Sequence, residues 1–104
     1  MRLVEVQMHS MVGIFKMDPA QSFRQRAELE ERIVPLVKHQ PGFVSASCSY
    51  DSQGDRTFAV VIFDTERAAL GMADFVREHM AQGNDAGVEL DSLVVAEVLT
   101  QVRR

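Results

Sequence analysis

The sequence predicts an α+β domain in which a four-stranded antiparallel sheet carries two helices on one face. Three observations lead to this fold class: four segments alternate in polarity, two amphipathic segments with capping residues lie between them, and the chain divides into two similar halves. The element order is β-α-β-β-α-β, the ferredoxin-like split-βαβ plan, and right-handed crossovers place both helices on the same face. The 104 residues fit one domain, residues 1–104.

The first half of the chain supplies one strand and one helix. Residues 2–10 alternate apolar and polar side chains and predict the first strand. Residues 11–17 are mostly apolar, and they either extend this strand through a bulge or form a loop that folds over an edge. The first helix begins at Asp18, whose carboxylate can cap it, with Pro19 at the first helical position. Pro35 lies inside the helical pattern and predicts a kink or a break there.

The second half follows the pair Pro41 and Gly42, which ends the first helix. The other three strands are the remaining segments of alternating polarity, at 43–50, 56–64 and 92–102. Residues 51–55 form the turn between the first two of them. Thr65 caps the second helix, and Gly83 lies where its C-terminal cap belongs. Apolar side chains share one arc of this helix: Ala69, Met72, Ala73, Val76 and Met80.

The composition excludes several classes of protein. The formal net charge is −4 and no block of Lys or Arg stands out, which argues against nucleic acid as a partner. The single cysteine, Cys48, excludes intrachain disulfides and fits a reducing compartment. No signal peptide is visible, and the longest apolar run, residues 59–63, is too short to span a bilayer. We therefore expect a cytoplasmic protein without a membrane partner.

The third and fourth strands are predicted to be apolar on both faces, although the helices cover only one. Another copy of the chain, packed sheet against sheet, is the economical cover for the second face, so we expect a homodimer. A charge at Val61 or Val95 should then dissociate or unfold the protein if those residues face the partner. Polar side chains expected on the same face would line the space between the two sheets: Gln7, His9, Ser45, Ser47 and Glu97.

An ordered set of short motifs adds a family resemblance. The set comprises "PGF" at 41–43, "VVIFDTERAAL" at 60–70, His79 near the end of the second helix, and "LVVAEVLTQV" at 93–102. With these motifs the chain resembles, over essentially its whole length, the antibiotic biosynthesis monooxygenase-like family of dimeric α+β barrel proteins. That family includes cofactor-free oxygenases of aromatic polyketides, haem-degrading oxygenases and many members without known activity. The resemblance implies a homodimer with a pocket inside each barrel half.

The resemblance also implies which positions would form a haem site. The haem-degrading branch places an Asn on its first strand and a Trp and a His on its second helix, at positions that here correspond to Gln7, Met72 and His79. The third strand in the family often ends in Trp, where this chain has Phe63, and the chain contains no Trp at all. We therefore expect that the protein does not degrade haem.

Three ionisable residues are candidates for chemistry, and each has a structural alternative. His79 is either a base or haem ligand in an apolar cavity, or a cation that interacts with the helix dipole. His9, which shares a strand face with Gln7, either deprotonates a phenolic substrate or forms a hydrogen bond across a dimer. Glu97 is either a catalytic carboxylate or the partner of an Arg or a hydroxyl in another chain. Because the resemblance supports it, we rank His79 first as the base, with Gln7 orienting the substrate.

Two functions from different classes fit these observations. The first is a cofactor-independent monooxygenase that acts on an aromatic or polyketide-like small molecule in a barrel cavity. The second is a non-catalytic homodimer of the same fold that binds a small hydrophobic ligand or serves a structural role. No cluster of His, Cys or Asp has metal-ligand spacing, so we expect no metal and no cofactor. The residues expected to contact the substrate are Phe63, Met72, Ser45, Ser47 and Glu97.

Overall fold

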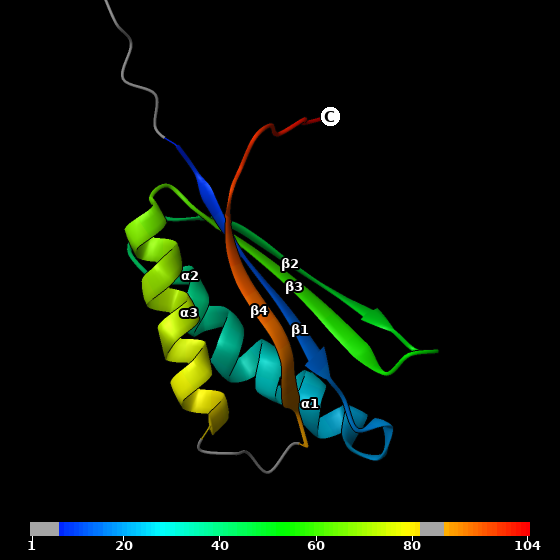
Figure 1. Cartoon of the computed structure of the whole chain (residues 1–104). Coiled ribbons are helices and arrows are strands. Elements are labelled where there is room, and N and C mark those ends of the chain that lie inside the picture. Colours follow the sequence, from blue (N-terminus) through cyan, green and yellow to red (C-terminus); the bar gives the residue numbers. More distant parts are fainter. Residues whose placement is uncertain (1–6, 82–86) are drawn as a thin grey trace, which may run out of the picture.

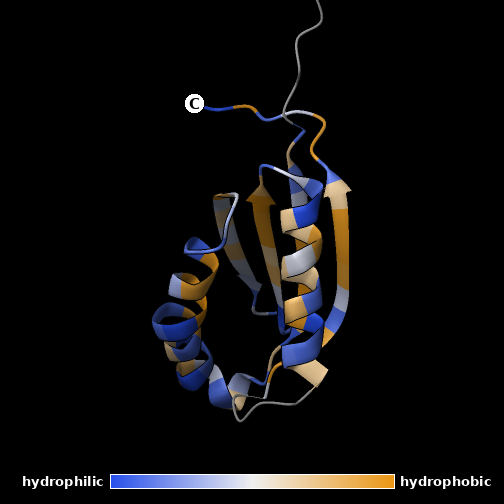
Figure 2. Ribbon diagram, turned by 90° about the vertical axis from the view of Figure 1, so that its left-hand side faces the viewer, coloured by the Kyte–Doolittle hydropathy of each residue, from blue (hydrophilic) through white to orange (hydrophobic). Residues whose placement is uncertain are grey.

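The computed structural model describes residues 7–81 and 87–104 and confirms the predicted fold class. The strands form one antiparallel sheet of order β2-β3-β1-β4. They are β1 (His9–Lys16), β2 (Phe43–Asp51), β3 (Arg56–Phe63) and β4 (Glu89–Glu97). The α-helices are α1 (Ser22–Glu28), α2 (Val34–Lys38) and α3 (Glu66–Ala81), and all lie on the same side of the sheet (Figures 1 and 2).

Two strands lie elsewhere along the chain than the sequence predicted. β1 runs over His9–Lys16 rather than 2–10, so residues 11–16 extend the strand instead of forming a loop. β4 ends at Glu97 rather than at residue 102. The pairing explains both differences, because β1 is central and its first residue, His9, pairs with Phe63 of β3 and with Glu97 of β4. The predicted strand residues 2–6 and the predicted cap Gly83 lie outside the described residues.

The first helical segment begins where predicted and changes its pitch before Pro35. The Asp18 carboxylate accepts a hydrogen bond from the Ala20 backbone N–H at 3.0 Å and caps a 3-10 turn that starts at Pro19. α1 follows, then a π-helical turn over Leu29–Ile33, and α2 carries Pro35 in its first turn. A proline ring displaces the carbonyl four residues earlier, and the wider π turn accommodates that displacement. The predicted irregularity is therefore a π turn within a continuing helical run.

The two faces of the sheet are both apolar, but only one is covered. The face toward the helices carries the core, which consists of Met11, Val37, Val61, Phe63, Ala69, Met72 and Ala73. The opposite side, here called the open face, carries the alternate residues of the strands: Val12, Ile14, Phe58, Val60, Ile62 and Val94. Within the described part of the chain no helix covers the open face (Figure 2). The cover expected for that face is therefore not supplied by this chain's own helices.

The strand register corrects the predicted placement of the polar residues. His9 is paired with Phe63 and with Glu97, and Phe63 is a core residue. His9 and Glu97 therefore point toward the helices and not, as predicted, into the space between two sheets. Ser45 and Ser47 do lie on the open face, because their partners on β3 lie there. Alternation along a strand divides its residues into two sets, but it does not say which set the helices cover.

The register also corrects the predicted position of two valines. Val61 is buried in the core and Val95 packs against it, so both face the helices rather than a partner.

A bulge on β2 is a second reason why alternation assigns some residues to the wrong face of the sheet. Phe43 and Ser45, two residues apart, fall on opposite faces because the pairing with β3 shifts between them. No helix among the described residues is long and apolar enough to cross a membrane.

Candidate functional site

α3 has two different flanks beside the arc that it buries against the sheet. On one flank the Arg77 guanidinium donates to the backbone carbonyl of Leu93 in β4 at 3.4 Å. Phe75 and His79 lie on the other flank, one turn apart at the i, i+4 spacing. Because β4 is an edge strand, this second flank faces the part of the sheet formed by β3 and β2, which α2 also contacts.

Phe75 and His79 form a stacked pair on this flank. Their ring centroids are 6.0 Å apart and the ring planes differ by 10°. Phe75 is 42% exposed, and His79 is half-buried. Across residues 7–81 and 87–104, no hydrogen bond or ion pair engages the His79 ring nitrogens. A neutral imidazole has one donor and one acceptor nitrogen, so His79 can take a proton from a molecule that lies against Phe75.

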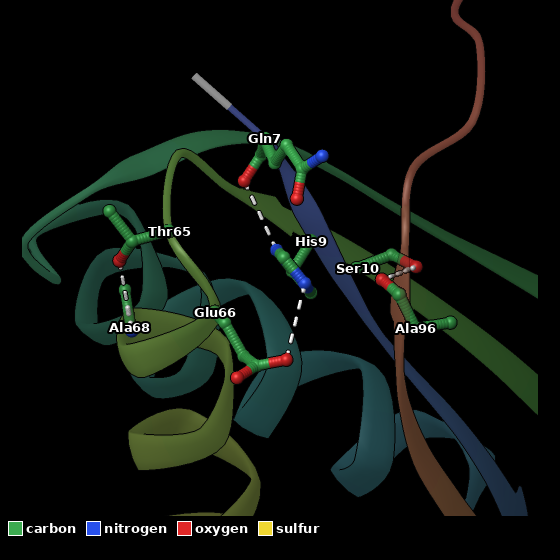
Figure 3. A network of polar contacts seen from close by, with 7 residues as sticks. All are labelled: Gln7, His9, Ser10, Thr65, Glu66, Ala68 and Ala96. Carbon is green, nitrogen blue, oxygen red and sulfur yellow. Dashed lines mark hydrogen bonds and ion pairs between the residues drawn. The ribbon is translucent and has the colours of Figure 1, made fainter. Parts of the chain in front are cut away.

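His9 has a different environment, although it is also a histidine on the helix side of the sheet. It is buried, with 8% of its surface exposed, and both ring nitrogens are occupied. Its Nδ1 lies 3.1 Å from the backbone carbonyl of Gln7, and its Nε2 lies 3.4 Å from a carboxylate oxygen of Glu66 (Figure 3). His9 therefore ties the beginning of α3 to β1 and leaves no free nitrogen for a substrate.

The two predicted bases do not share a site. His9 contacts Glu66 in the first turn of α3, whereas His79 lies in the last turn of the same helix. His79 lies thirteen positions after Glu66 in α3, which corresponds to about 20 Å along the helix axis. His39, the third histidine, is exposed at the end of α2 with its Nδ1 2.7 Å from the carbonyl of Pro35. Of the three histidines, only His79 combines an aromatic neighbour with ring nitrogens that no described residue engages.

Gln7 and Glu97 come together at the end of the sheet near His9, away from His79. Both line an open hollow of about 710 Å³ with residues that follow β4, among them Leu99 and Arg103. Gln7 contacts His9 through its backbone carbonyl, and its side-chain amide points away from the imidazole (Figure 3). Gln7 is therefore not positioned to orient a substrate at His79.

The apolar residues predicted to contact a substrate are enclosed by the protein. Phe63 is fully buried, and its ring meets that of Phe43 edge-on, with centroids 6.5 Å apart and an angle of 81° between the planes. Met72 is buried two turns before His79 on α3. Ser45 and Ser47 are exposed on the open face, on the far side of the sheet from His79. The residues predicted to contact a substrate therefore lie in three separate places. Phe63 and Met72 are in the core, Ser45 and Ser47 are on the open face, and Glu97 is at the end of the sheet near His9.

The sequence did not indicate one further concave region, at the end of α3 that carries His79. An open hollow of about 820 Å³ lies there, and its lining includes Met17, Met80, Leu90, Lys16 and Arg77. These residues come from the ends of β1 and α3 and from the start of β4. These residues come together only because of where those elements end, and the periodic pattern of the sequence does not specify those ends.

The Phe75–His79 pair, in contrast, could be recognised in the sequence, because an aromatic residue and a histidine lie one helical turn apart.

The other reactive groups that the structure describes, Cys48 and Tyr50, are not arranged as a catalytic centre. Partial desolvation raises the pKa of the Cys48 thiol, although the residue is exposed on β2, so the thiolate needed for nucleophilic attack is less populated than usual. The pKa of Tyr50 is raised by desolvation, by its hydrogen bond to Asp55, and by the charges of Asp55 and Asp51. In the described part of the chain, no group of three or more His, Cys, Asp or Glu residues could hold a metal ion.

Comparisons with known proteins show the fold. No family model matches the chain, and no curated protein matches it significantly. The haem degrader MhuD of Mycobacterium tuberculosis, solved with two haems in its active site, superposes with a TM-score of 0.67 and 17% identity over 92% of this chain and 99% of that one. The monooxygenase ActVA-Orf6 of Streptomyces coelicolor, solved with nanaomycin D, gives a TM-score of 0.60 and 17% identity over 95% and 93%.

A third structure carries the same fold. A candidate antibiotic biosynthesis monooxygenase from Chloroflexus aurantiacus has a TM-score of 0.61 and 19% identity, over 92% of this chain and 97% of that one. The chain therefore has the ferredoxin-like α+β fold of the antibiotic biosynthesis monooxygenase-type proteins. Fold alone does not fix an activity, because one fold hosts many functions.

Proposed function

We propose that the protein is a monooxygenase of the antibiotic biosynthesis type that oxidises an aromatic or polyketide-like small molecule without a metal or an organic cofactor. The observation that carries this proposal is the stacked pair of Phe75 and His79, in which both imidazole nitrogens are unengaged among the described residues. Phe75 offers an aromatic face for a planar substrate, and His79 offers the base. The monooxygenases of the same fold support the reaction class.

The chemistry requires little from the protein beyond a base beside an apolar surface. His79 takes a proton from a phenol or from an activated C–H of the substrate, and the resulting anion reduces dioxygen. For an anthrone, the reacting CH2 carbon becomes a carbonyl, one oxygen atom stays on the substrate, and the other leaves as water. Imidazole suits the proton transfer because it ordinarily changes its charge between pH 5 and 8.

We also propose that the protein is a homodimer formed by two open faces. Cross-strand neighbours on that face are large and apolar, and Phe58 and Val94 remain exposed in one protomer. An uncovered apolar surface that spans several strands is typical of an interface. Ser45 and Ser47 would lie at the margin of this interface, on β2, rather than in a substrate pocket.

The non-catalytic alternative has one structural argument in its favour. Phe63 and Met72, which the substrate was expected to contact, are enclosed by neighbouring side chains. The described hollows lie at the two ends of the domain. A protein whose interior is filled in this way could bind a ligand only at its rim, or serve as a structural dimer. Oxygen consumption separates the two readings.

Oxygen uptake with anthrones and quinols tests the oxygenase proposal. We expect His79→Ala to lower turnover by about 10²-fold, which is the usual contribution of a general base. His39→Ala is the matched control, because that imidazole is exposed at the end of α2 and should leave turnover unchanged. No uptake by the wild type, or full activity in His79→Ala, would favour the non-catalytic dimer.

A stability measurement tests the structural alternative, in which His79 only stabilises the C-terminal end of α3. The residue lies in the last turn of α3, where a protonated imidazole interacts favourably with the helix dipole. If that were its only function, His79→Ala would lower the melting temperature at acidic pH and leave turnover alone. The oxygenase proposal instead expects turnover to fall at a pH where the variant is as stable as the wild type.

A further inference from the structure

The central strand β1 has a gap in its row of helix-facing side chains. Met11 on this side is buried in the core, but the next residue on the same side is Gly13, which has no side chain. The partner of Gly13 on β3 is Ala59, which is small and buried. We call Gly13 and Ala59 the floor, because they carry a single methyl group between them at this level of the sheet.

The ring of Phe15 fills the place that a side chain at Gly13 would take. A Cβ atom added to Gly13 would lie 2.8 Å from Cε2 and 3.1 Å from Cζ of Phe15, and 3.4 Å from a methyl carbon of Leu93. The two distances to the ring are shorter than an ordinary carbon–carbon contact of about 3.5–4.0 Å. The ring therefore turns back along β1 and lies over the floor, although Phe15 itself is only half-buried.

The floor and the stacked pair of Phe75 and His79 lie at matching levels of the domain. The contact of His9 with Glu66 joins the beginnings of β1 and α3, and both elements run from there toward the same end of the domain (Figure 1). Counted from that contact, Gly13 lies about 13 Å along β1, at about 3.3 Å per residue. The stacked pair lies about 14 to 20 Å along α3, at about 1.5 Å per residue. The flank of α3 that carries the pair also faces β3, where half of the floor lies.

The open hollow of about 820 Å³ shows that the ends of β1 and α3 meet. Lys16 and Leu90, the neighbours of Phe15 along β1 and across to β4, line this hollow together with Met80 of α3. The Phe15 ring, turned back from this end of the strand, therefore stands between the hollow and the floor.

The exchange of the Phe15 ring for a ligand ring would keep the floor covered. A phenyl ring makes no hydrogen bonds that would fix it, and rotation about its first side-chain torsion leads to another staggered rotamer. That rotation would expose the apolar floor to water, and an incoming apolar ring would remove the same surface from water again. A planar aromatic compound is the ligand that such an exchange accommodates.

We propose that the Phe15 ring is a movable plug that sets the size of the substrate. When the plug turns away, one ring of a planar aromatic substrate lies on the floor and faces His79. This inference rests on the proposed oxygenase function and names a specificity-determining residue for it. It also explains how a substrate enters although Phe63 and Met72 are enclosed.

Binding of anthraquinone-2-sulfonate tests the plug. This planar tricyclic probe is already oxidised at the carbon that the proposed reaction attacks, so it binds without turnover. Phe15→Ala should lower its dissociation constant, measured by calorimetry, by about tenfold or more, because the wild type binds only in the fraction of molecules whose plug is open. Phe23→Ala is the matched control, because Phe23 is 92% exposed on α1, and it should leave the dissociation constant unchanged.

Gly13→Ala shows whether the probe lies on the floor. Added to Phe15→Ala, it should raise the dissociation constant back toward the wild-type value, because the new methyl group occupies the space that the ring left. Added to the wild type, it should lower the melting temperature, because the methyl group meets the Phe15 ring. The same change in the Phe15→Ala protein should lower the melting temperature less, since only the Leu93 contact at 3.4 Å remains.

Three outcomes would overturn the plug: no binding of the probe by Phe15→Ala, the same affinity as the wild type in a folded variant, or a gain in affinity that survives Gly13→Ala. Circular dichroism verifies folding, and if Phe15→Ala does not fold, Phe15→Leu takes its place with an expected gain of about threefold. Probe binding requires no oxygen chemistry. A plug in a protein without oxygen uptake therefore removes the oxygenase proposal alone, whereas His79-dependent uptake with unchanged probe affinity removes the plug alone.

Discussion

Val60 and Val61 are neighbours on β3 and chemically identical, yet their surroundings differ. Val61 is buried among Met11, Val95 and the residues of α3, whereas Val60 is half-buried on the open face. The same contrast runs across the sheet, since the helix-facing residues form the core and the open-face residues are apolar without a helix above them.

This comparison shows what the alternation of a strand does and does not determine. A strand that is apolar on both sides must be covered on both sides. The chain supplies cover for one side, through α3 and the α1–α2 segment. Among the residues that the structure describes, no helix covers the other side, so we expect its cover to come from a second copy. Variants on the two faces should therefore fail in different ways, one by unfolding and one by dissociation.

The largest expected effect comes from placing a carboxylate on each face in turn. Val61→Asp should not fold, because burying an unpaired charge costs several kcal/mol, which is comparable to the whole stability of a small domain. Val60→Asp should fold but should raise the dimer dissociation constant about 30-fold or more, as the loss of an interface hot spot implies. Circular dichroism and light scattering measure the two outcomes. A dimeric Val60→Asp would remove the open face from the interface.

The sequence was sufficient for the order and type of the elements, because helix caps and alternating polarity are local signals. Asp18 and Thr65 cap their helices as predicted. The end of β4 was predicted wrongly, since a strand stops where its partner stops and not where its own pattern stops. The faces were also misassigned, because alternation is symmetric until the position of the helices is known.

The candidate site was predictable only in part. His79 and Phe75 were identifiable from helical spacing, because both lie on one helix. The sequence could not show that His9 is a poorer candidate for the base than His79. One of its ring nitrogens contacts Glu66, which is distant in sequence, so this contact is visible only in the folded protein. Phe63 and Met72 could have lined a ligand cavity or been buried in the core. Which of the two holds depends on how the helices pack on the sheet, and the periodicity of the sequence carries no information about that packing.

A second prediction concerns the covered side and compares two residues of α3. Met72→Ala should lower the free energy of unfolding by about 2–5 kcal/mol, because it leaves a cavity between α3 and the sheet. Leu70→Ala on the exposed side of the same helix should cost much less, since Leu70 is already exposed. Urea denaturation measures both. Equal losses would mean that Leu70 is also covered, by a partner or by another part of the chain.

A third prediction concerns His9, whose proposed function is structural. His9→Ala should destabilise the fold by about 1–3 kcal/mol, because it removes a buried side chain and its contact with the Gln7 carbonyl. Glu66→Gln should cost under about 1 kcal/mol, because that carboxylate is mostly exposed to water. Both variants should keep oxygen turnover once folded. Loss of turnover in a stable His9→Ala protein would instead make His9 the base.

The smallest expected effect lies at the end of β2, where the helices no longer cover the sheet. Tyr50 is the only tyrosine and the chain has no Trp, so the phenolate absorbance reports this residue alone. Its pKa lies above the ordinary value of 10.0, first because of desolvation, then because of the hydrogen bond to Asp55 and the charges of Asp55 and Asp51. The titration midpoint of the wild type should therefore exceed 10.0.

Substituting the two carboxylates in turn separates these causes. Asp55→Asn removes a charge and weakens the hydrogen bond that favours the neutral phenol, so the midpoint should fall toward the ordinary value. Asp51→Asn removes only a charge, and its effect should be smaller in the same direction. Neither variant should remove the whole shift, because desolvation remains. A wild-type midpoint at or below 10.0, or a midpoint that neither substitution lowers, would contradict this assignment of causes.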